Sequence, residues 1–358
     1  GILYICVNGI YTLTHNQFRW ELKSMQFAIT SILVTISTST FAIIFAFGLG
    51  WSLPGLLLGM LLGSVTGLLY GIIRLRDSIR RVYSKRRLKE MLVFSAPLVP
   101  SSIAVFVSHY IDRLMINHFL SQTDLGLYGI AFRLSSIVSL AIIGFQGALT
   151  PLIYTHFRSK ETPANIAAIF RAFLFFAVTL FYGLSAFADE ILHLLATPEY
   201  YPAANLVVFL VPGILISNMY VFAPGIGIAK KTHFSLWINV IGAITNTCLN
   251  YYLIPMFSTN GAAVATLLGF LLVFTLNVHY SQKFYPIPYN WILIAKAFFI
   301  SCIAVFIARS LPFNLLSNIL LKCCLGVTLL VILSKLGLIT QKERAKFFRL
   351  VFPVSRVK

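Results

Sequence analysis

A series of apolar stretches, each about as long as a membrane crossing, dominates this sequence. A helix needs about 20 predominantly apolar residues to span the hydrocarbon core of a bilayer. Runs of this length predict helices, because the strands of a membrane barrel would show segments of about ten residues that alternate between apolar and polar. We therefore expect an all-α polytopic membrane protein with spans at 1–14, 25–48, 51–73, 92–116, 126–154, 168–188, 204–228, 234–256, 260–281, 291–310 and 314–335.

The short connections between these stretches carry Lys and Arg almost entirely on one side. The formal charge of +18 would suggest a nucleic-acid partner in a soluble protein. Here the basic residues gather in the loops that follow the first, third, fifth, seventh and ninth stretches and in the tail. The opposite loops carry Arg309 and the acidic residues Asp124, Asp189, Glu190 and Glu199. Because loops rich in Lys and Arg stay in the cytoplasm, the pattern predicts a multi-pass protein of the cell inner membrane with a cytoplasmic C-terminus and no nucleic-acid partner.

The most basic connection, RLRDSIRRVYSKRRLKE at 74–90, predicts a cytoplasmic linker between two blocks of spans. Similar segments in the same order on its two sides, such as GILY at 1–4 and GILI at 213–216, suggest a duplicated bundle. We expect the last three spans of a first lobe at 1–73, the linker at 74–91, a six-span second lobe at 92–285, two additional spans at 286–335 and a basic tail at 336–358. Because residue 1 already lies in an apolar stretch, we expect a fragment whose first lobe lacks three spans.

Three segments resemble a known family. FSAPLVPSSIAVFVSHYIDRLM at 94–115 is similar to the start of the second lobe in bacterial polysaccharide flippases, where a Pro-Leu-Val-Pro helix leads into Asp-Arg. EYYPAANLVVFLVPG at 199–213 and LNYYLIPMFSTNGAAVATLLG at 249–269 resemble the same family. The resemblance points to the multidrug/oligosaccharidyl-lipid/polysaccharide (MOP, MATE-like) exporter superfamily, with the O-antigen (Wzx-type) flippases nearest.

The resemblance implies a transporter with two six-helix lobes around a cavity that opens alternately to the two sides of the membrane. The implied cargo is an oligosaccharide, such as the O-antigen repeat unit of lipopolysaccharide, on an undecaprenyl pyrophosphate carrier. It would move from the cytoplasmic to the periplasmic leaflet. The implied partners are this lipid-linked oligosaccharide, the bilayer and other polysaccharide assembly proteins, with coupling to a H⁺ or Na⁺ gradient and no cofactor.

Two arginines inside predicted spans are candidates for binding the cargo. A charge at the centre of a spanning helix costs about 3 kcal/mol, so Arg113 and Arg133 need a reason to be there. A guanidinium offers a planar fork of donors that matches phosphate oxygens. Both are therefore candidates to receive a pyrophosphate or an acidic sugar. The alternatives are an ion pair between helices and a side chain that extends to the outer interface.

Asp112 and His109 are candidates for ion coupling. Asp112 is the acidic residue that we place near the membrane interior, so it is the natural group to bind a proton or a sodium ion. The alternative is a counter-ion to Arg113 or Arg133. His109 lies one helical turn from Asp112 and titrates near neutral pH, but it also fits a hydrogen-bonded packing residue.

A polar stripe follows one face of the span at 234–256. Asn239, Asn246 and Asn250 recur at helical spacing, so they share a face that avoids lipid. The stripe predicts either hydrogen bonds between helices or contacts to sugar hydroxyls. Gln146 in the span at 126–154 admits the same two interpretations. These four residues complete the predicted cavity site.

Other functions are less well supported by the sequence. A cation-coupled multidrug antiporter of the same superfamily would call for an acidic cavity, and a flippase for the peptidoglycan precursor shares the fold and the basic cavity. A membrane glycosyltransferase or polymerase would need a larger extramembrane segment, and no GxxxxGK[ST], HExxH or GxSxG occurs, so we do not expect an enzyme. The cysteines all fall in apolar stretches and predict neither a disulfide nor a metal site. A scaffold without transport activity is the remaining alternative.

Overall fold

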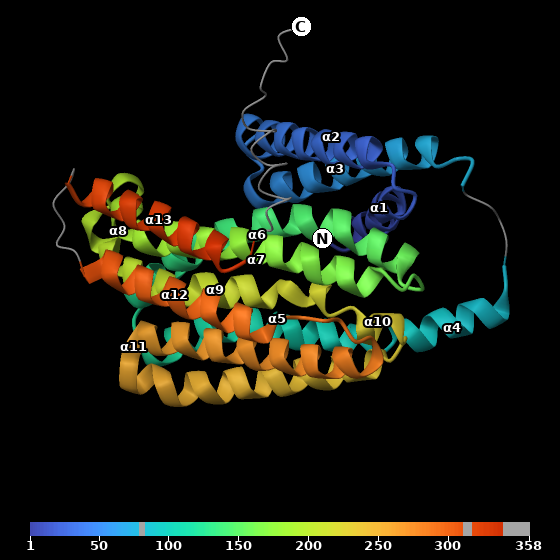
Figure 1. Cartoon of the computed structure of the whole chain (residues 1–358). Helices are drawn as coiled ribbons and strands as arrows, with labels where there is room; N and C mark the ends of the chain where they lie inside the picture. The colour runs from blue at the N-terminus through green and yellow to red at the C-terminus, as the bar shows by residue number, and fades with distance from the viewer. Residues whose placement is uncertain (79–82, 311–316, 339–358) are drawn as a thin grey trace, which may run out of the picture. The chain divides into compact units, whose positions relative to one another are not determined.

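The computed structural model describes residues 1–78, 83–310 and 317–338, and every regular element in these ranges is helical (Figure 1). The prediction of an all-α fold is therefore confirmed. The chain forms two compact units. The first comprises Gly1–Leu88 together with Gly147–Leu152, and the second comprises the other described residues. The assignment of these parts to lobes of a duplicated bundle stays a prediction.

The helices are joined by short connections. In chain order they are α1 (Ile2–Trp20), α2 (Ser24–Ile43), α3 (Ser52–Arg74), α4 (Lys85–Ser95), α5 (Leu98–Phe119), α6 (Gln122–His156), α7 (Thr162–Ala186), α8 (Ala188–Leu195), α9 (Ala204–Ser217), α10 (Gly225–Ile228), α11 (Thr232–Phe284), α12 (Trp291–Ser310) and α13 (Ser317–Lys335). A π-helical turn continues α2 over Ile44–Gly48, and 3-10 turns flank α9 at Pro198–Ala203 and Met219–Phe222.

Within the described ranges, nine helical segments are long and apolar enough to cross a membrane. The 53-residue α11 counts once among the nine although it contains a kink. α1 is 19 residues long but mixes Asn8, His15 and Gln17 into its apolar sequence, and it is not among the nine. With α11 taken as two arms and α1 added, the helices correspond to the apolar stretches of the sequence. The chain is a multi-pass membrane protein.

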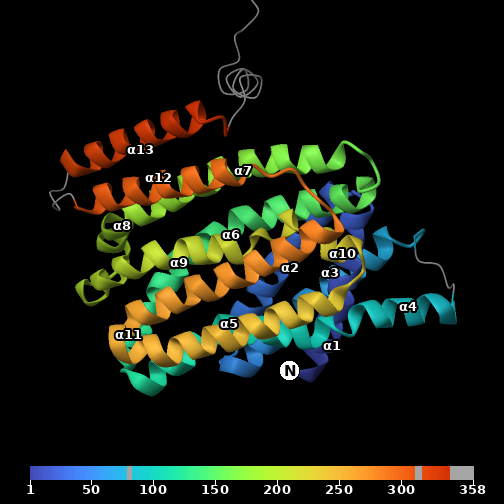
Figure 2. The ribbon, with the colours of Figure 1, turned by 60° about the horizontal axis from the view of Figure 1, so that its bottom comes forward.

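α11 is a hairpin whose two antiparallel arms lie side by side in Figures 1 and 2. The backbone reverses at Ser258, where φ is 55° and ψ is −140°. Glycines of α11 face residues of the opposite arm: Gly261 faces Leu253, Gly269 faces Asn246 and Gly242 faces Val273. The partners move away from Ser258 by similar steps on both arms, as an antiparallel pair requires. The predicted spans at 234–256 and 260–281 are these two arms.

In the first unit, α3 packs against α1 and α2 through a row of glycines at every fourth position. Five of them are buried, namely Gly55, Gly59, Gly63, Gly67 and Gly71. A Cβ on Gly59 would lie 2.5 Å from the backbone nitrogen of Ala42 in α2. Helices in lipid gain little from the hydrophobic effect, so close backbone approach through small residues supplies the packing contacts.

The second unit is built around α11. α5 and α9 both pack along it, α7 packs against α9 and α12, and α13 packs against α12 and α7 (Figure 2). The interior is apolar, with large side chains such as Ile116, Leu206, Leu210 and Ile238 fully buried. Polar side chains inside this unit therefore need partners within the protein.

The structure differs from the predicted boundaries at one span. The stretch at 204–228 is not one helix, because α9 ends at Ser217 and its span extends instead toward Pro198. Past this end, the Asn218 amide donates to the carbonyl of Ile214, and Pro224 has no backbone N–H to continue a helix. α4 begins at Lys85, inside the predicted linker at 74–91. Residues 314–316 of the last predicted span, and 339–358 of the predicted tail, lie outside the described residues.

Candidate functional site

The candidate residues on α5 diverge into two environments. Neighbouring side chains on a helix point about 100° apart, so Asp112 and Arg113 face different parts of the protein. Asp112 is fully buried against α6 and α11, whereas Arg113 is half-buried and faces a cavity. The structure therefore separates a buried carboxylate from an accessible guanidinium on the same helical turn.

Asp112 is held by the phenol of Tyr128 on α6, which donates to one carboxylate oxygen. The backbone N–H of Arg113 donates to the other carboxylate oxygen at 2.8 Å. The Thr266 hydroxyl on the second arm of α11 donates to the carbonyl of Ala262 at 2.9 Å and lies 3.2 Å from the Tyr128 phenol oxygen. Asp112, Tyr128 and Thr266 thus gather where α5, α6 and α11 meet. Asp112 forms no ion pair with any described residue. Its alternative role as the counter-ion of Arg113 therefore has no ion pair behind it in the described part of the chain.

Asn246 and Asn250 lie deep between the arms of α11. The Asn246 amide donates to the carbonyl of Ala265 at 3.2 Å, and the Asn250 amide donates to both oxygens of Asn246, at 2.9 and 3.1 Å. The side-chain oxygen of Asn250 is buried without a hydrogen-bond partner among the described residues. Asn246 ties the two arms together, Asn250 bonds within the first arm, and neither lines any of the cavities described below. Their predicted contact with substrate stays a prediction.

Arg113 lines a cavity of about 380 Å³ with Ser102, Val105, Phe106, His109, Tyr110 and Phe132, which we call the Arg113 cavity. Its guanidinium lies 4.3 Å from the ring centroid of Phe132 and 5.0 Å from that of Tyr110. One Nη donates to the backbone carbonyl of His109 at 3.1 Å. The aromatic faces stabilise the charge in a place where water is scarce, and they fix the plane of the guanidinium.

His109 stands between the Arg113 cavity and a second one of about 360 Å³, which we call the amide cavity. Its ring packs against Phe270 with centroids 4.8 Å apart. The amide cavity is further lined by Asn218, Asn239 and Asn277, by Ser217 and Ser235, and by the aromatic residues Tyr220 and Phe274. Val105 and His109 border both cavities, so the two are adjacent and share this wall.

The structure places the other two candidates apart from this pair of cavities. Arg133 on α6 is exposed, and its guanidinium has no partner among the described side chains. Gln146 is half-buried, where its amide donates to the backbone carbonyl of Asn218 and its oxygen accepts from the Tyr220 hydroxyl at 3.4 Å. Gln146 thus supports the wall of the amide cavity without lining it. Both assignments to substrate stay predictions.

Sequence reasoning missed two ion pairs on α8. Asp189 pairs with Arg309 of α12 at 3.3 Å, and Glu190 pairs with Lys322 of α13 at 2.6 Å. Lys322 is only 4% exposed, and its ammonium also lies 5.9 Å from the ring centroid of Phe187. The signal was available, because a lysine inside an apolar span needs a counter-charge and two consecutive acidic residues stand at 189 and 190. These pairs bind α12 and α13 to the rest of the second unit.

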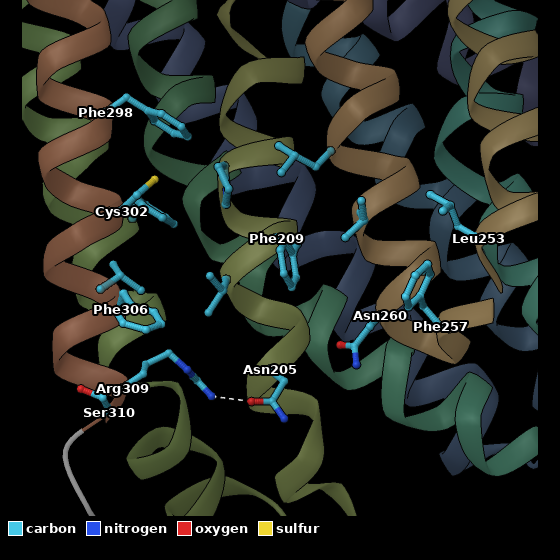
Figure 3. Close-up of a pocket in the computed structure, with 17 residues that line it drawn as sticks. Asn205, Phe209, Leu253, Phe257, Asn260, Phe298, Cys302, Phe306, Arg309 and Ser310 are labelled. Carbon is cyan, nitrogen blue, oxygen red and sulfur yellow. Dashed lines mark hydrogen bonds between the residues drawn. The ribbon is translucent and has the colours of Figure 1, made fainter.

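A larger cavity, of about 960 Å³, lies among α7, α9, α11 and α12 (Figure 3). Phe209, Phe257, Phe298 and Phe306 project into it, and the polar residues Arg309, Asn205 and Asn260 gather at one end. Arg309 donates to the side-chain oxygen of Asn205 at 2.7 Å, as the dashed line marks. None of the predicted site residues reaches this cavity. Its lining suits hydrocarbon chains rather than ions.

The described side chains give the site a definite chemistry. The paired cavities offer one guanidinium, one imidazole and several neutral amides, and no carboxylate lines either of them. Within the described ranges, no group of three or more His, Cys, Asp or Glu residues could hold a metal ion. Such a lining suits binding of an anion and of hydrogen-bonding groups.

The sequence matches known proteins over part of its length. The family model described as "Polysaccharide biosynthesis protein" matches residues 2–210. A probable low-salt glycan biosynthesis flippase of Haloferax volcanii is 24% identical over 227 residues, which are 62% of this chain and 48% of that protein. The Lsg locus putative protein 1 of Haemophilus influenzae is 35% identical over 71 residues, which are 20% of this chain and 18% of that protein. The chain therefore spans at most about half the length of these curated relatives.

Solved transporters share the fold. The crystal structure of MATE in the straight conformation superimposes with a TM-score of 0.63 at 16% identity, covering 76% of this chain and 65% of that one. Lipid II flippase MurJ in its inward closed conformation superimposes with a TM-score of 0.61 at 14% identity, covering 96% of this chain and 71% of that one. At these identities the likeness establishes the fold alone.

Proposed function

The chain belongs to the polysaccharide biosynthesis protein family, and from this premise we propose that it is a flippase for an oligosaccharide linked to undecaprenyl pyrophosphate. The glycan, an O-antigen unit or a similar repeat, moves from the cytoplasmic to the periplasmic leaflet by alternating access. The proposal concerns the activity of the whole protein. It places the protein in the cell inner membrane with its C-terminus in the cytoplasm, beside other polysaccharide assembly proteins.

Arg113 is the observation that carries the proposal. A guanidinium inside a spanning helix is costly, yet this one lies at a cavity and pairs with no described carboxylate. Among the residues that the structure describes, only the carbonyl of His109 accepts a hydrogen bond from this guanidinium. The remaining donors, held in plane by Phe132 and Tyr110, suit the oxygens of a pyrophosphate.

The large cavity of Figure 3 supports the lipid half of the proposal. Its walls are aromatic and aliphatic, and its polar residues stand at one end only. Space of this kind accepts a hydrocarbon chain without leaving polar groups unpaired. A carrier with a long isoprenoid tail needs such surfaces within the membrane.

Asp112 is the group that we assign to ion coupling. Its carboxylate, the Thr266 hydroxyl and the unpartnered oxygen of Asn250 are buried oxygens inside the membrane region. Oxygens in such a setting suit a proton or a sodium ion, and the hydrogen bond from Tyr128 of α6 gives the binding of such an ion to Asp112 a route to change the packing of α5 against α6. His109, one turn away, is the second member of this assignment.

The multidrug antiporter is the less supported alternative. Its cationic substrates would need acidic groups facing the cavity, whereas the Arg113 cavity and the amide cavity are lined by Arg113, His109 and neutral side chains. An anionic cargo therefore fits the described lining better.

The test is export of polysaccharide by the full-length protein carrying Arg113→Ala. We expect surface polysaccharide to be lost while membrane insertion is unchanged, and Arg158→Ala, at an exposed arginine just past α6, is the matched control. Normal polysaccharide from Arg113→Ala would remove this residue from the proposed cargo site.

A further inference from the structure

The amide cavity brings three asparagines together from distant parts of the sequence. Asn218 lies just past the end of α9, Asn239 in the first arm of α11 and Asn277 in the second arm. All three are half-buried and line the same cavity of about 360 Å³. Asn218 and Asn277 lie outside the polar stripe of the sequence, so only the fold reveals this grouping.

The orientation of each side-chain amide is fixed by its surroundings. The amide nitrogen of Asn277 donates to the carbonyl of Val273 at 3.0 Å, and that of Asn218 donates to the carbonyl of Ile214 at 2.9 Å. A carbonyl only accepts hydrogen bonds, so in both residues the nitrogen must face it.

The amide of Asn239 is oriented by the hydroxyl of Ser101. The Ser101 hydroxyl donates to the carbonyl of Ser235 at 3.4 Å and therefore accepts from the Asn239 amide nitrogen at 2.8 Å. In all three residues the nitrogen is thus engaged by the protein. Their Oδ1 atoms receive no hydrogen bond from any residue that the structure describes.

A cavity lined in this way selects for donors. Three free carbonyl oxygens attract O–H and N–H groups, and their partial negative charge disfavours a phosphate. Aromatic side chains, Phe270, Phe274 and Tyr220, complete the lining and offer faces on which the apolar side of a sugar ring packs. The guanidinium that would take an anion lies in the neighbouring Arg113 cavity, across His109.

We propose that the amide cavity is the subsite for the sugar next to the pyrophosphate, recognised through its hydroxyl and acetamido N–H donors. This inference rests on the proposed function and deepens it, because it divides the cargo between two adjacent cavities. The pyrophosphate binds at Arg113, and the first sugar binds at Asn218, Asn239 and Asn277. His109 stands at the boundary between the two.

The test compares two probes on the purified full-length protein in nanodiscs. One is undecaprenyl pyrophosphate without sugar, and the other is the same carrier bearing a single N-acetylhexosamine. The variants are Asn218→Leu and Asn277→Leu, which keep the side-chain size but remove the acceptor. Asn165→Leu, at an exposed asparagine in the first turn of α7, is the matched control.

We expect the wild-type protein to bind the sugar-bearing probe more tightly than the bare carrier. Each cavity variant should weaken binding of the sugar-bearing probe by about tenfold, the worth of one or two hydrogen bonds, and leave binding of the bare carrier unchanged. The unchanged binding of the bare carrier also verifies that the variants are folded.

The remaining outcomes overturn the inference in distinguishable ways. If the bare carrier binds and the sugar adds no affinity, or if the variants bind the sugar-bearing probe like the control, the sugar subsite is wrong while the proposed function stands. If neither probe binds the wild-type protein, both proposals fail together.

Discussion

The phenol of Tyr128 on α6 donates a hydrogen bond to the carboxylate of Asp112 on α5, and both side chains are fully buried. Thr266 on the second arm of α11 lies beside this pair, with its hydroxyl oxygen 3.2 Å from the Tyr128 phenol oxygen. The three side chains therefore meet where α5, α6 and α11 pack together. A change in the charge of Asp112 alters the hydrogen bond that ties α5 to α6 at this point.

Asp112→Asn tests this network, because the amide keeps the shape of the side chain and removes its charge. An imposed proton or sodium gradient should stimulate translocation by wild type, and we expect this stimulation to be at least about tenfold smaller in the variant. The reason is that a neutral amide does not ionise near neutral pH and binds cations weakly. The measurement is flipping of lipid-linked glycan by full-length protein in proteoliposomes with an imposed gradient. Asp77→Asn, at a highly exposed aspartate after α3, is the control. Wild-type stimulation in Asp112→Asn would end the coupling assignment.

Arg113→Lys separates charge from shape at the cavity. Lysine keeps the positive charge but loses the planar fork and the flat contact with Phe132. We expect flipping to fall by about tenfold in Arg113→Lys, and further in Arg113→Ala. Arg133→Ala should cost less than Arg113→Ala, because Arg133 is exposed and lines neither cavity. Equal losses at both arginines would show that the static cavity misses part of the cargo site.

Gly59→Ala tests the glycine row of α3. The added Cβ would meet the backbone of Ala42, which cannot yield without moving α2. We expect a loss of about 2 kcal/mol or more in the stability of the purified protein, seen as a lower melting temperature in detergent. Gly9→Ala in α1, where nothing lies within 4 Å of the added Cβ, should be neutral or slightly stabilising. Identical melting of the two variants would contradict the close packing of α2 and α3.

Lys322→Met tests the buried ion pair of α13. Removing one partner leaves the Glu190 carboxylate uncompensated and should cost about 3 kcal/mol, whereas the double variant with Glu190→Gln should recover most of that loss. Thermal melts of the wild type, of Lys322→Met, of Glu190→Gln and of the double variant measure the coupling. Lys296→Met, at an exposed lysine in α12, controls for the loss of a lysine and should change little. Additive effects of the two substitutions would show that the pair is not energetically coupled.

Acidification should weaken the turn between α1 and α2. Hydrogen bonds from Lys23, Gln17 and Ser78 lower the pKa of the Glu21 carboxyl from its ordinary value of 4.5 to about 2. A lowered pKa stabilises the folded state above pH 4.5, and the contribution is lost as the pH falls toward 2. Because the pair with Lys23 is partly exposed, we expect at most about 1 kcal/mol. The melting temperatures of wild type and Glu21→Gln should differ at pH 6 and converge near pH 2; a constant difference would contradict the assignment.

The sequence predicts the helices well because a membrane leaves the backbone few choices. Apolar runs of spanning length must be helical, since every N–H and C=O needs a partner in the same segment. The break after Ser217 escaped prediction because it depends on local competition, where the Asn218 side chain bonds to the Ile214 carbonyl in a segment as apolar as its neighbours.

The candidate site was predictable only in part, because it depends on contacts between residues that are far apart in the sequence. Helical spacing identified Asp112, Arg113 and His109, but which of them is buried depends on α6 and α11, far away in the sequence. Asn218 and Asn277 were not identified because their cavity is assembled by three segments. The counter-charges of Lys322 and Arg309 likewise come from α8, more than a hundred residues earlier.

The hairpin of α11 has a consequence for biosynthesis. Asn246 in the first arm finds its partner in Ala265 of the second arm, so its amide is unsatisfied while the first arm is alone in lipid. The reversal at Ser258 leaves almost no polar loop between the arms. We therefore expect the ribosome to deliver both arms before either leaves the translocon, so that the pair enters the bilayer as one unit, already hydrogen-bonded.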